Sequence, residues 1–412
     1  MLDILKNMTE VNAGFKIKNR GDCELLSELI FDKTSDTLSY NVLRRFFGLA
    51  NYMKPNKETL NTLAKFNGYN DYPDFLVQNP YENYWTTKEK LYDIIISDSR
   101  EILLFINNLN IKNKDSIDIL VTLCRELIHF RRLDVLNEVL KSNNLNLNKF
   151  TYSEILHFGN SIGELLKTNN KIGENLLSNS NFLNFVYCIY IDYENINGYY
   201  SKWSRYVYEN TSDIGIKCFA QAILQLKNYL NNQKVSYDKF ISIDTSNFHP
   251  ILQGRIFTIK ILSSGFCQDD LTDKLKELNV KNDSSILLDF FYEPMTVALF
   301  SKNFSLMKAI IDILSTKKMN TKYYHQHHEN LYNLMSLFYL RWSNNINNKR
   351  LAIKVNITDF KYSYRSIFNL YALIIKYHLE NKNTEHLNKL NNLSIKMNHP
   401  LISKDYCISY FD

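Results

Sequence analysis

The side chains best suited by type and spacing to a chemical task gather in residues 38–68. This stretch holds five basic residues and a single acid, Glu58, so its net charge is +4. Arginine can donate paired hydrogen bonds to guanine, asparagine pairs in the same way with adenine, and lysine neutralises phosphate. The stretch therefore indicates an anionic partner such as a nucleic acid. The five bases are Arg44, Arg45, Lys54, Lys57 and Lys65.

The charge of the surrounding segment qualifies this interpretation. Residues 1–80 carry ten bases and ten acids, so their net charge is zero. A nucleic-acid-binding domain is usually basic as a whole, and a neutral domain with one basic face binds phosphate more weakly. The alternative is a small helical cap on the rest of the chain, whose basic face is only solvated.

The bases need a short helix to position them. Ser39 can cap a helix through its hydroxyl, and Gly48 can end it. Within residues 40–48, the apolar Leu43, Phe46 and Phe47 fall on one face, which we expect to be buried. The residues that lie away from that face are Tyr40, Asn41, Arg44 and Arg45.

Further helices are expected on both sides. The next helix begins near Asn56, buries Leu60, Leu63, Ala64 and Phe66, and ends at Gly68. Before the short helix, residues 21–36 read as a helix capped by Asp22, and Leu2–Met8 as a shorter one. These elements together predict a small all-helical domain over residues 1–78.

Residues 38–68 resemble the XRE/Cro/C1-type helix-turn-helix family of DNA-binding proteins. In that family a short recognition helix begins at Ser or Thr and carries an arginine before a closing glycine. A basic–proline loop and a helix of the pattern ThxxLAxxhG follow, where h is apolar. Residues 21–36 would supply the earlier helices, although the usual Gln-x-x-Leu-Ala signature is absent there. The matching residues are Ser39, Arg44, Arg45, Gly48, Lys54, Pro55, Thr59, Leu60, Leu63, Ala64 and Gly68.

The remainder of the chain predicts a long helical body. The 412 residues include only 11 Gly and 6 Pro, and such a scarcity of helix breakers favours long helices over strands. We expect an all-α fold with a helix-turn-helix-like domain at 1–78, a linker at 79–87 and an irregular α-solenoid at 88–412. The stretch at 351–357 (LAIKVNI) is the one place where a short strand is considered.

Helix-length periodic stretches in this body alternate with short polar breaks. At least five helical hairpins with no strict period are expected, and the segment LLDFFYEPMTVALFSKNFSLMKAIIDIL in one of them resembles a loose tetratricopeptide pair. A further single helix is expected at 181–194. Three of these hairpins pair 116–130 with 134–144, 198–210 with 213–232, and 284–303 with 305–318.

Other kinds of site find little support in the sequence. His325, His328 and Glu329 could share a helical face with zinc-like spacing, but an exposed polar helix start is the preferred interpretation. No nucleophile elbow, P-loop or dinucleotide-binding motif is present, so we expect neither an enzyme nor a cofactor or metal. The six cysteines are widely spaced and read as buried thiols. With no signal peptide or membrane span evident, the expected location is the cytoplasm.

The resemblance supplies the first functional hypothesis, a bacterial transcriptional regulator. Double-stranded DNA would be read by Ser39, Tyr40, Asn41, Arg44 and Arg45 in the major groove, with Lys54 and Lys57 on phosphate. Helix-turn-helix readers usually act as homodimers. The body would serve dimerisation or hold a peptide or protein ligand, as in peptide-responsive regulators that join an XRE-type domain to a tetratricopeptide-like solenoid.

The second hypothesis is a protein-interaction scaffold that binds no nucleic acid. Its N-terminal helices would only cap the solenoid. The state of Arg44 and Arg45 distinguishes the two hypotheses, because a scaffold could pair both guanidinium groups with the acids of residues 21–36 or bury them.

Overall fold

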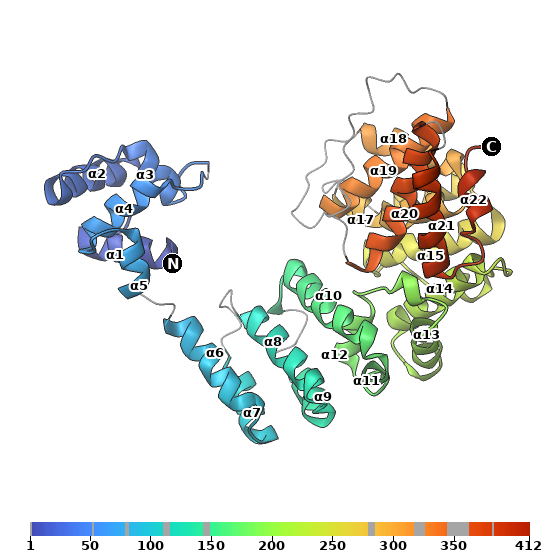
Figure 1. The fold of residues 1–412 in the computed structure, drawn as a ribbon, viewed down its shortest axis with the longest axis horizontal. Helices are drawn as coiled ribbons and strands as arrows, with labels where there is room; N and C mark the ends of the chain where they lie inside the picture. Colours follow the sequence, from blue (N-terminus) through green and yellow to red (C-terminus); the bar gives the residue numbers. More distant parts are fainter. Residues whose placement is uncertain are drawn as a thin grey trace. The chain divides into compact units, whose positions relative to one another are not determined.

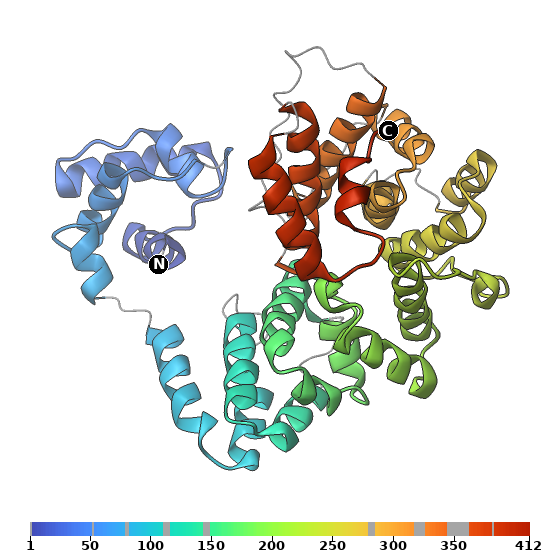
Figure 2. The same cartoon turned by 45° about the vertical axis from the view of Figure 1, so that its right-hand side comes forward.

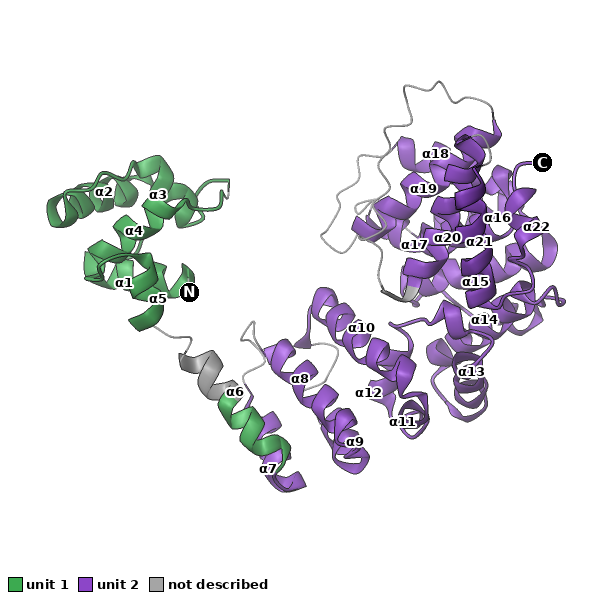
Figure 3. Ribbon diagram, viewed as in Figure 1, with its two compact units in different colours: residues 1–96 green, residues 97–412 purple. Residues whose placement is uncertain are grey.

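The computed structural model describes residues 2–51, 53–78, 82–109, 116–142, 149–278, 285–316, 326–343, 362–380 and 383–412. Within these ranges every regular element is helical, which confirms the all-α class (Figure 1). The chain forms two compact units, residues 1–96 and residues 97–412, coloured separately in Figure 3. Residues 351–357, where a strand was considered, lie outside the described residues.

The first unit is built on one apolar core. Helices α2, α3, α4 and α1 contribute fully buried side chains, among them Leu26, Leu43, Leu63 and Leu5, and Phe75 of α5 closes the cluster. The helices pack in the pairs α2–α3, α2–α4, α4–α5 and α1–α4. The helices of this unit are α1 (Leu2–Ala13), α2 (Arg20–Thr34), α3 (Tyr40–Phe46), α4 (Lys57–Phe66), α5 (Tyr72–Gln78) and α6 (Glu82–Ile95).

Helix ends in this unit follow the expected capping chemistry with two corrections. Ser39 and Asn56 cap α3 and α4 as predicted, and Gly48 and Gly68 adopt positive φ just beyond those helices. Asp22 does not cap α2; Asn19 does, and Asp22 completes its capping box at the third helical position. Helix α1 also continues to Ala13, well beyond the predicted end at Met8.

The predicted linker at 79–87 is helical over most of its length. Helix α6 begins at Glu82, so the aromatic, turn-like appearance of residues 82–87 does not produce a loop. The division between the two compact units falls after Ile96 instead.

The second unit stacks helices largely in chain order. Figure 2 shows α7 to α10 in succession, and α8 packs on both α9 and α10. The elements are α7 (Ser99–Asn108), α8 (Ser116–His129), α9 (Leu133–Lys141), α10 (Tyr152–Thr168), α11 (Asn170–Glu174), α12 (Ser180–Phe182), η3 (Leu183–Tyr187), η4 (Tyr193–Asn195), α13 (Tyr199–Asn210), α14 (Ile214–Leu230), η5 (Asp238–Phe240), α15 (Pro250–Ser264), α16 (Gln268–Glu277), α17 (Ser285–Phe300), α18 (Phe304–Ser315), α19 (Gln326–Trp342), α20 (Tyr362–Leu379), α21 (Thr384–Met397) and α22 (Lys404–Ile408).

The three hairpins predicted with both partners form contacting pairs, and the predicted helix at 181–194 is wrong. Helices α8 and α9, α13 and α14, and α17 and α18 pack against each other. Residues 181–194 instead pass through the short π-helix η3, an irregular stretch and the 3-10 turn η4. This segment packs on two glycines of α10: a Cβ on Gly159 would lie 2.3 Å from the Phe185 carbonyl oxygen, and one on Gly163 would lie 2.2 Å from the Tyr190 ring.

The end of the chain returns to the middle of this unit. Helices α20 and α21 both contact η4, and α20 also contacts α10. The ring Nε2 of His399 donates to the carbonyl oxygen of Tyr193 (2.8 Å), and the hydroxyl of Tyr410 donates to the carbonyl oxygen of Leu299 (2.6 Å). The hairpins therefore stack in series as in a solenoid, and the last helices add contacts across the series that nearest-neighbour stacking alone does not make.

Most cysteines are removed from solvent. Cys188 is half-buried and Cys267 is exposed, so the prediction of buried thiols is wrong for Cys267. The fully or largely buried thiols are those of Cys23, Cys124, Cys218 and Cys407.

Candidate functional site

Helix α3 holds the predicted base-reading residues away from the core. Leu43 and Phe46 are buried on its inner side. Ser39, Asn41 and Arg45 are exposed, whereas Tyr40 and Arg44 are half-buried. Beyond the helix, Lys54 and Lys57 are exposed.

Contacts within this group distinguish its members. The Ser39 hydroxyl accepts the Val42 amide (3.4 Å), so its oxygen is already used in capping. Arg44 donates from Nη1 to the side-chain oxygen of Asn41 (3.4 Å). The Tyr40 ring lies under the Arg20 guanidinium, 4.6 Å from ring centroid to Cζ. Tyr40 is therefore occupied by a contact inside the unit.

Ion pairing separates the bases of the first unit into two groups. The paired bases lie on α1, on α2, between them, or at the end of α4. Among the described residues, Arg44, Arg45, Lys54 and Lys57 have no carboxylate within ion-pair distance, and neither do Lys18, Lys33 and Lys90. Their positive charge is thus uncompensated by direct contact. The paired bases are Lys6 with Asp3 (3.7 Å), Lys16 with Glu10 (2.7 Å), Arg20 with Glu24 (2.7 Å) and Lys65 with Asp36 (3.0 Å).

The histidine-rich segment lies elsewhere and is not the exposed polar helix start that we expected. His327 and His328 are both buried in α19, at 3% and 1% exposure. His325 lies outside the described residues. Within the described part of the chain, no group of three or more potential ligands could hold a metal ion.

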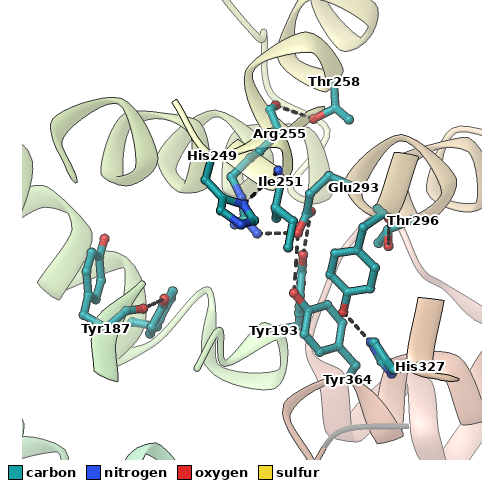
Figure 4. A network of polar contacts seen from close by, with 12 residues as sticks. Tyr187, Tyr193, His249, Ile251, Arg255, Thr258, Glu293, Thr296, His327 and Tyr364 are labelled. Carbon is teal, nitrogen blue, oxygen red and sulfur yellow. Dashed lines mark hydrogen bonds and ion pairs between the residues drawn. The ribbon is translucent and has the colours of Figure 1, made fainter. Parts of the chain in front are cut away.

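Sequence reasoning missed a buried polar network in the second unit, drawn in Figure 4. Arg255 of α15 forms an ion pair from Nη2 with Glu293 of α17, and their side chains are only 4% and 2% exposed. The other Glu293 oxygen accepts the Tyr193 hydroxyl (3.1 Å), and the Tyr364 hydroxyl lies 3.5 Å from the first. Burial by itself would lower the pKa of Arg255, but the Glu293 charge beside it raises that pKa above its usual value.

Two residues of unusual type let the two helices of this ion pair approach closely. Pro294 has no N–H to donate to the carbonyl oxygen of Phe290, four residues earlier in α17. That oxygen faces Gly254 of α15, where an added Cβ would lie only 2.0 Å from it. Gly254 precedes Arg255, so the close approach brings the guanidinium to Glu293. A glycine next to an arginine, and a proline after a glutamate, were the available sequence signals.

The chain matches no protein-family model, and comparison with curated proteins and with solved structures finds no match either. Among the described residues, no helix has both the length and the apolar character needed to cross a lipid bilayer.

Proposed function

We propose that this chain is a DNA-binding regulator whose first unit contacts double-stranded DNA through α3. Arg44, Arg45 and Asn41 contact base edges with Ser39 and Tyr40 beside them, and Lys54 and Lys57 contact phosphate. The helical body serves as a sensor or dimerisation platform. One observation carries the proposal: four bases without a carboxylate contact among the described residues gather on α3 and near the start of α4, whereas the other unpaired bases of the unit, Lys18, Lys33 and Lys90, lie outside this segment and its remaining described bases are ion-paired.

Uncompensated charge matters because DNA affinity depends mainly on it. Each phosphate neutralised by a base releases condensed counterions, so the slope of log K against log salt grows by about 0.9 per contact. A lysine already bound to a carboxylate must break that pair first. Lys65, paired with Asp36, is therefore left out of the proposed surface.

A scaffold that binds no nucleic acid is the second candidate. The contact between Tyr40 and Arg20 favours it, because a ring covered by a guanidinium inside its own unit is not free to meet a base. In this case the bases on α3 would be solvated and have no partner.

The test is fluorescence anisotropy of the full chain on a mixed-sequence DNA duplex at about 50 mM and about 200 mM salt. The Arg44→Glu/Arg45→Glu variant should lose binding at both concentrations. The matched control is Lys16→Glu/Lys65→Glu, which changes the net charge equally but at ion-paired bases. Its binding should stay within about threefold of the original. Circular dichroism checks that both variants keep their helices.

Two results would overturn the proposal. One is the absence of binding by the unaltered chain at the lower salt concentration. The other is equal loss in the variant and its control, which would indicate attraction by net charge alone. Either result favours the scaffold. Sedimentation at micromolar concentration tests the dimer that the proposal includes.

A further inference from the structure

A cavity of about 440 Å³ lies in the second unit, with Arg255 in its wall. Exposed residues such as His249 and Asp213 stand at its mouth, while Tyr292, Tyr364 and Arg255 are buried. The walls between are mostly aliphatic and aromatic side chains from α10, α14 and α15. Its volume falls in the range of about 300–1,000 Å³ that small-molecule sites occupy.

Arg255 brings unused hydrogen-bonding capacity to this cavity. Its Nη2 is bound to Glu293, but Nε and Nη1 are buried and meet no acceptor among the described residues. A buried donor without a partner is costly, by more when the group is charged. A molecule that brings an acceptor to these two nitrogens would remove that cost.

The other polar groups at the buried end already have partners. The Tyr292 hydroxyl is hydrogen-bonded to the ring of His327, and the Tyr364 hydroxyl points to Glu293. At the mouth, Nδ1 of His249 accepts the Ile251 amide, as Figure 4 shows. What the buried end lacks is therefore an acceptor for Arg255 and not a donor.

Charge decides between a neutral acceptor and an anion. Glu293 already neutralises Arg255 at close range. Asp213 adds a carboxylate to the cavity wall, and among the described residues no other Lys or Arg side chain lines it. A carboxylate or phosphate ligand would leave an excess negative charge in a buried site, which is strongly unfavourable.

We infer that this cavity binds an uncharged molecule with an apolar chain and a carbonyl group, such as a medium-chain amide or ester. The carbonyl oxygen accepts hydrogen bonds from Nε or Nη1 of Arg255, and the chain fills the apolar walls toward the mouth. The inference concerns the second unit alone and does not rest on DNA binding by the first.

The test is isothermal titration calorimetry of the full chain with three eight-carbon probes: octanamide, octanoate and octylamine. Octanamide should bind at least about tenfold more tightly than either charged probe, because only it satisfies Arg255 without adding charge. Arg255→Lys keeps a positive charge beside Glu293 but loses the guanidinium fork. It should weaken octanamide binding about tenfold to a hundredfold.

A second variant keeps the test decisive if Arg255→Lys folds poorly. Ile155→Trp fills the cavity from α10 without touching the ion pair and should abolish octanamide binding. Its control is Ile395→Trp on α21, outside the cavity and 67% exposed, which should bind as the original chain does. The Arg44→Glu/Arg45→Glu variant should also bind octanamide normally, so failure of DNA binding leaves this test intact.

Three outcomes overturn the inference. The first is tighter binding of octanoate than of octanamide, which would mean an anion site. The second is an octanamide affinity that is unchanged in both Arg255→Lys and Ile155→Trp. The third is no measurable heat from octanamide up to its solubility limit.

Discussion

Neutralising Glu293 alone should destabilise the second unit severely. In Glu293→Gln the guanidinium of Arg255 stays buried, at 4% exposure, without its counter-charge. Arginine cannot lose its proton in a protein, so the buried charge can be solvated only if the unit unfolds. Removing one partner of a buried ion pair costs about 3–5 kcal/mol. Because this arginine already has two unsatisfied nitrogens, we expect the upper part of that range.

Removing both charges should restore much of the loss. In Arg255→Met/Glu293→Gln the methionine keeps most of the side-chain volume, and the glutamine oxygen can still accept the Tyr193 hydroxyl. Buried ion pairs replaced by uncharged groups of similar volume are often neutral in stability or better. The double variant should therefore be at least about 2 kcal/mol more stable than Glu293→Gln.

Urea unfolding followed by far-ultraviolet circular dichroism measures both variants. The first unit has its own core and lacks the pair, so its part of the transition should not shift. A Glu293→Gln variant within about 1 kcal/mol of the original chain would refute the reasoning, since the pair would then be solvated rather than buried. A double variant less stable than Glu293→Gln would refute it equally, by showing that packing and not charge sets the cost.

Three further predictions concern pH, close packing and capping. Burial lowers the pKa of His399 below its usual 6.5, so the unfolded chain takes up the proton at a higher pH than the folded chain does. The free energy of unfolding therefore falls as the pH drops below about 6.5. The slope is at most ~1.4 kcal/mol per pH unit and ends once the pH is below the lowered pKa. The pKa of His249 is lowered by desolvation as well and contributes in the same direction, so His399→Gln should reduce that slope, without removing it, in urea titrations between about pH 7 and about pH 5; an unchanged slope would mean that other groups cause it. Gly254→Ala should destabilise the second unit by about 1–3 kcal/mol, because its Cβ would meet the Phe290 carbonyl oxygen at 2.0 Å; a variant as stable as the original in urea would show that α15 and α17 separate easily. Asn56→Ala removes the acceptor that caps α4 and should cost the first unit about 1 kcal/mol in its thermal transition, with no change there if water replaces the cap.

Local patterns predicted the helices best where a cap, an apolar face and a stop signal agree. Helix α3 shows all three, with Ser39 before it, Leu43 and Phe46 inside it and Gly48 after it. Residues 181–194 show only the apolar content of a helix. Their path is set by contacts with Gly159 and Gly163 of α10, outside the segment itself, so the periodicity within the segment could not reveal it.

The candidate DNA surface could be predicted from local sequence, whereas the buried network could not. The bases of α3 were visible as a charge run within one segment. Arg255 and Glu293 are 38 residues apart, and Tyr193 is 100 residues from Glu293. Single charged residues in apolar helices look like ordinary solvated positions until the packing of α15 on α17 is known. Long-range partners of this kind are invisible to any window-based reading.

The return of the chain's end to η4 has a consequence for protein synthesis. The carbonyl oxygen of Tyr193 accepts its hydrogen bond from His399, which is synthesised 206 residues later. At about 5–20 residues per second, translation leaves that carbonyl and its apolar surroundings uncovered for about 10–40 s. The apolar cluster of α1 to α5 is complete at Phe75, so these helices can pack together long before His399 is made. A nascent chain should therefore carry folded N-terminal helices together with an incomplete second unit that exposes apolar surface. Conditions that slow translation should increase the dependence of the second unit on chaperones.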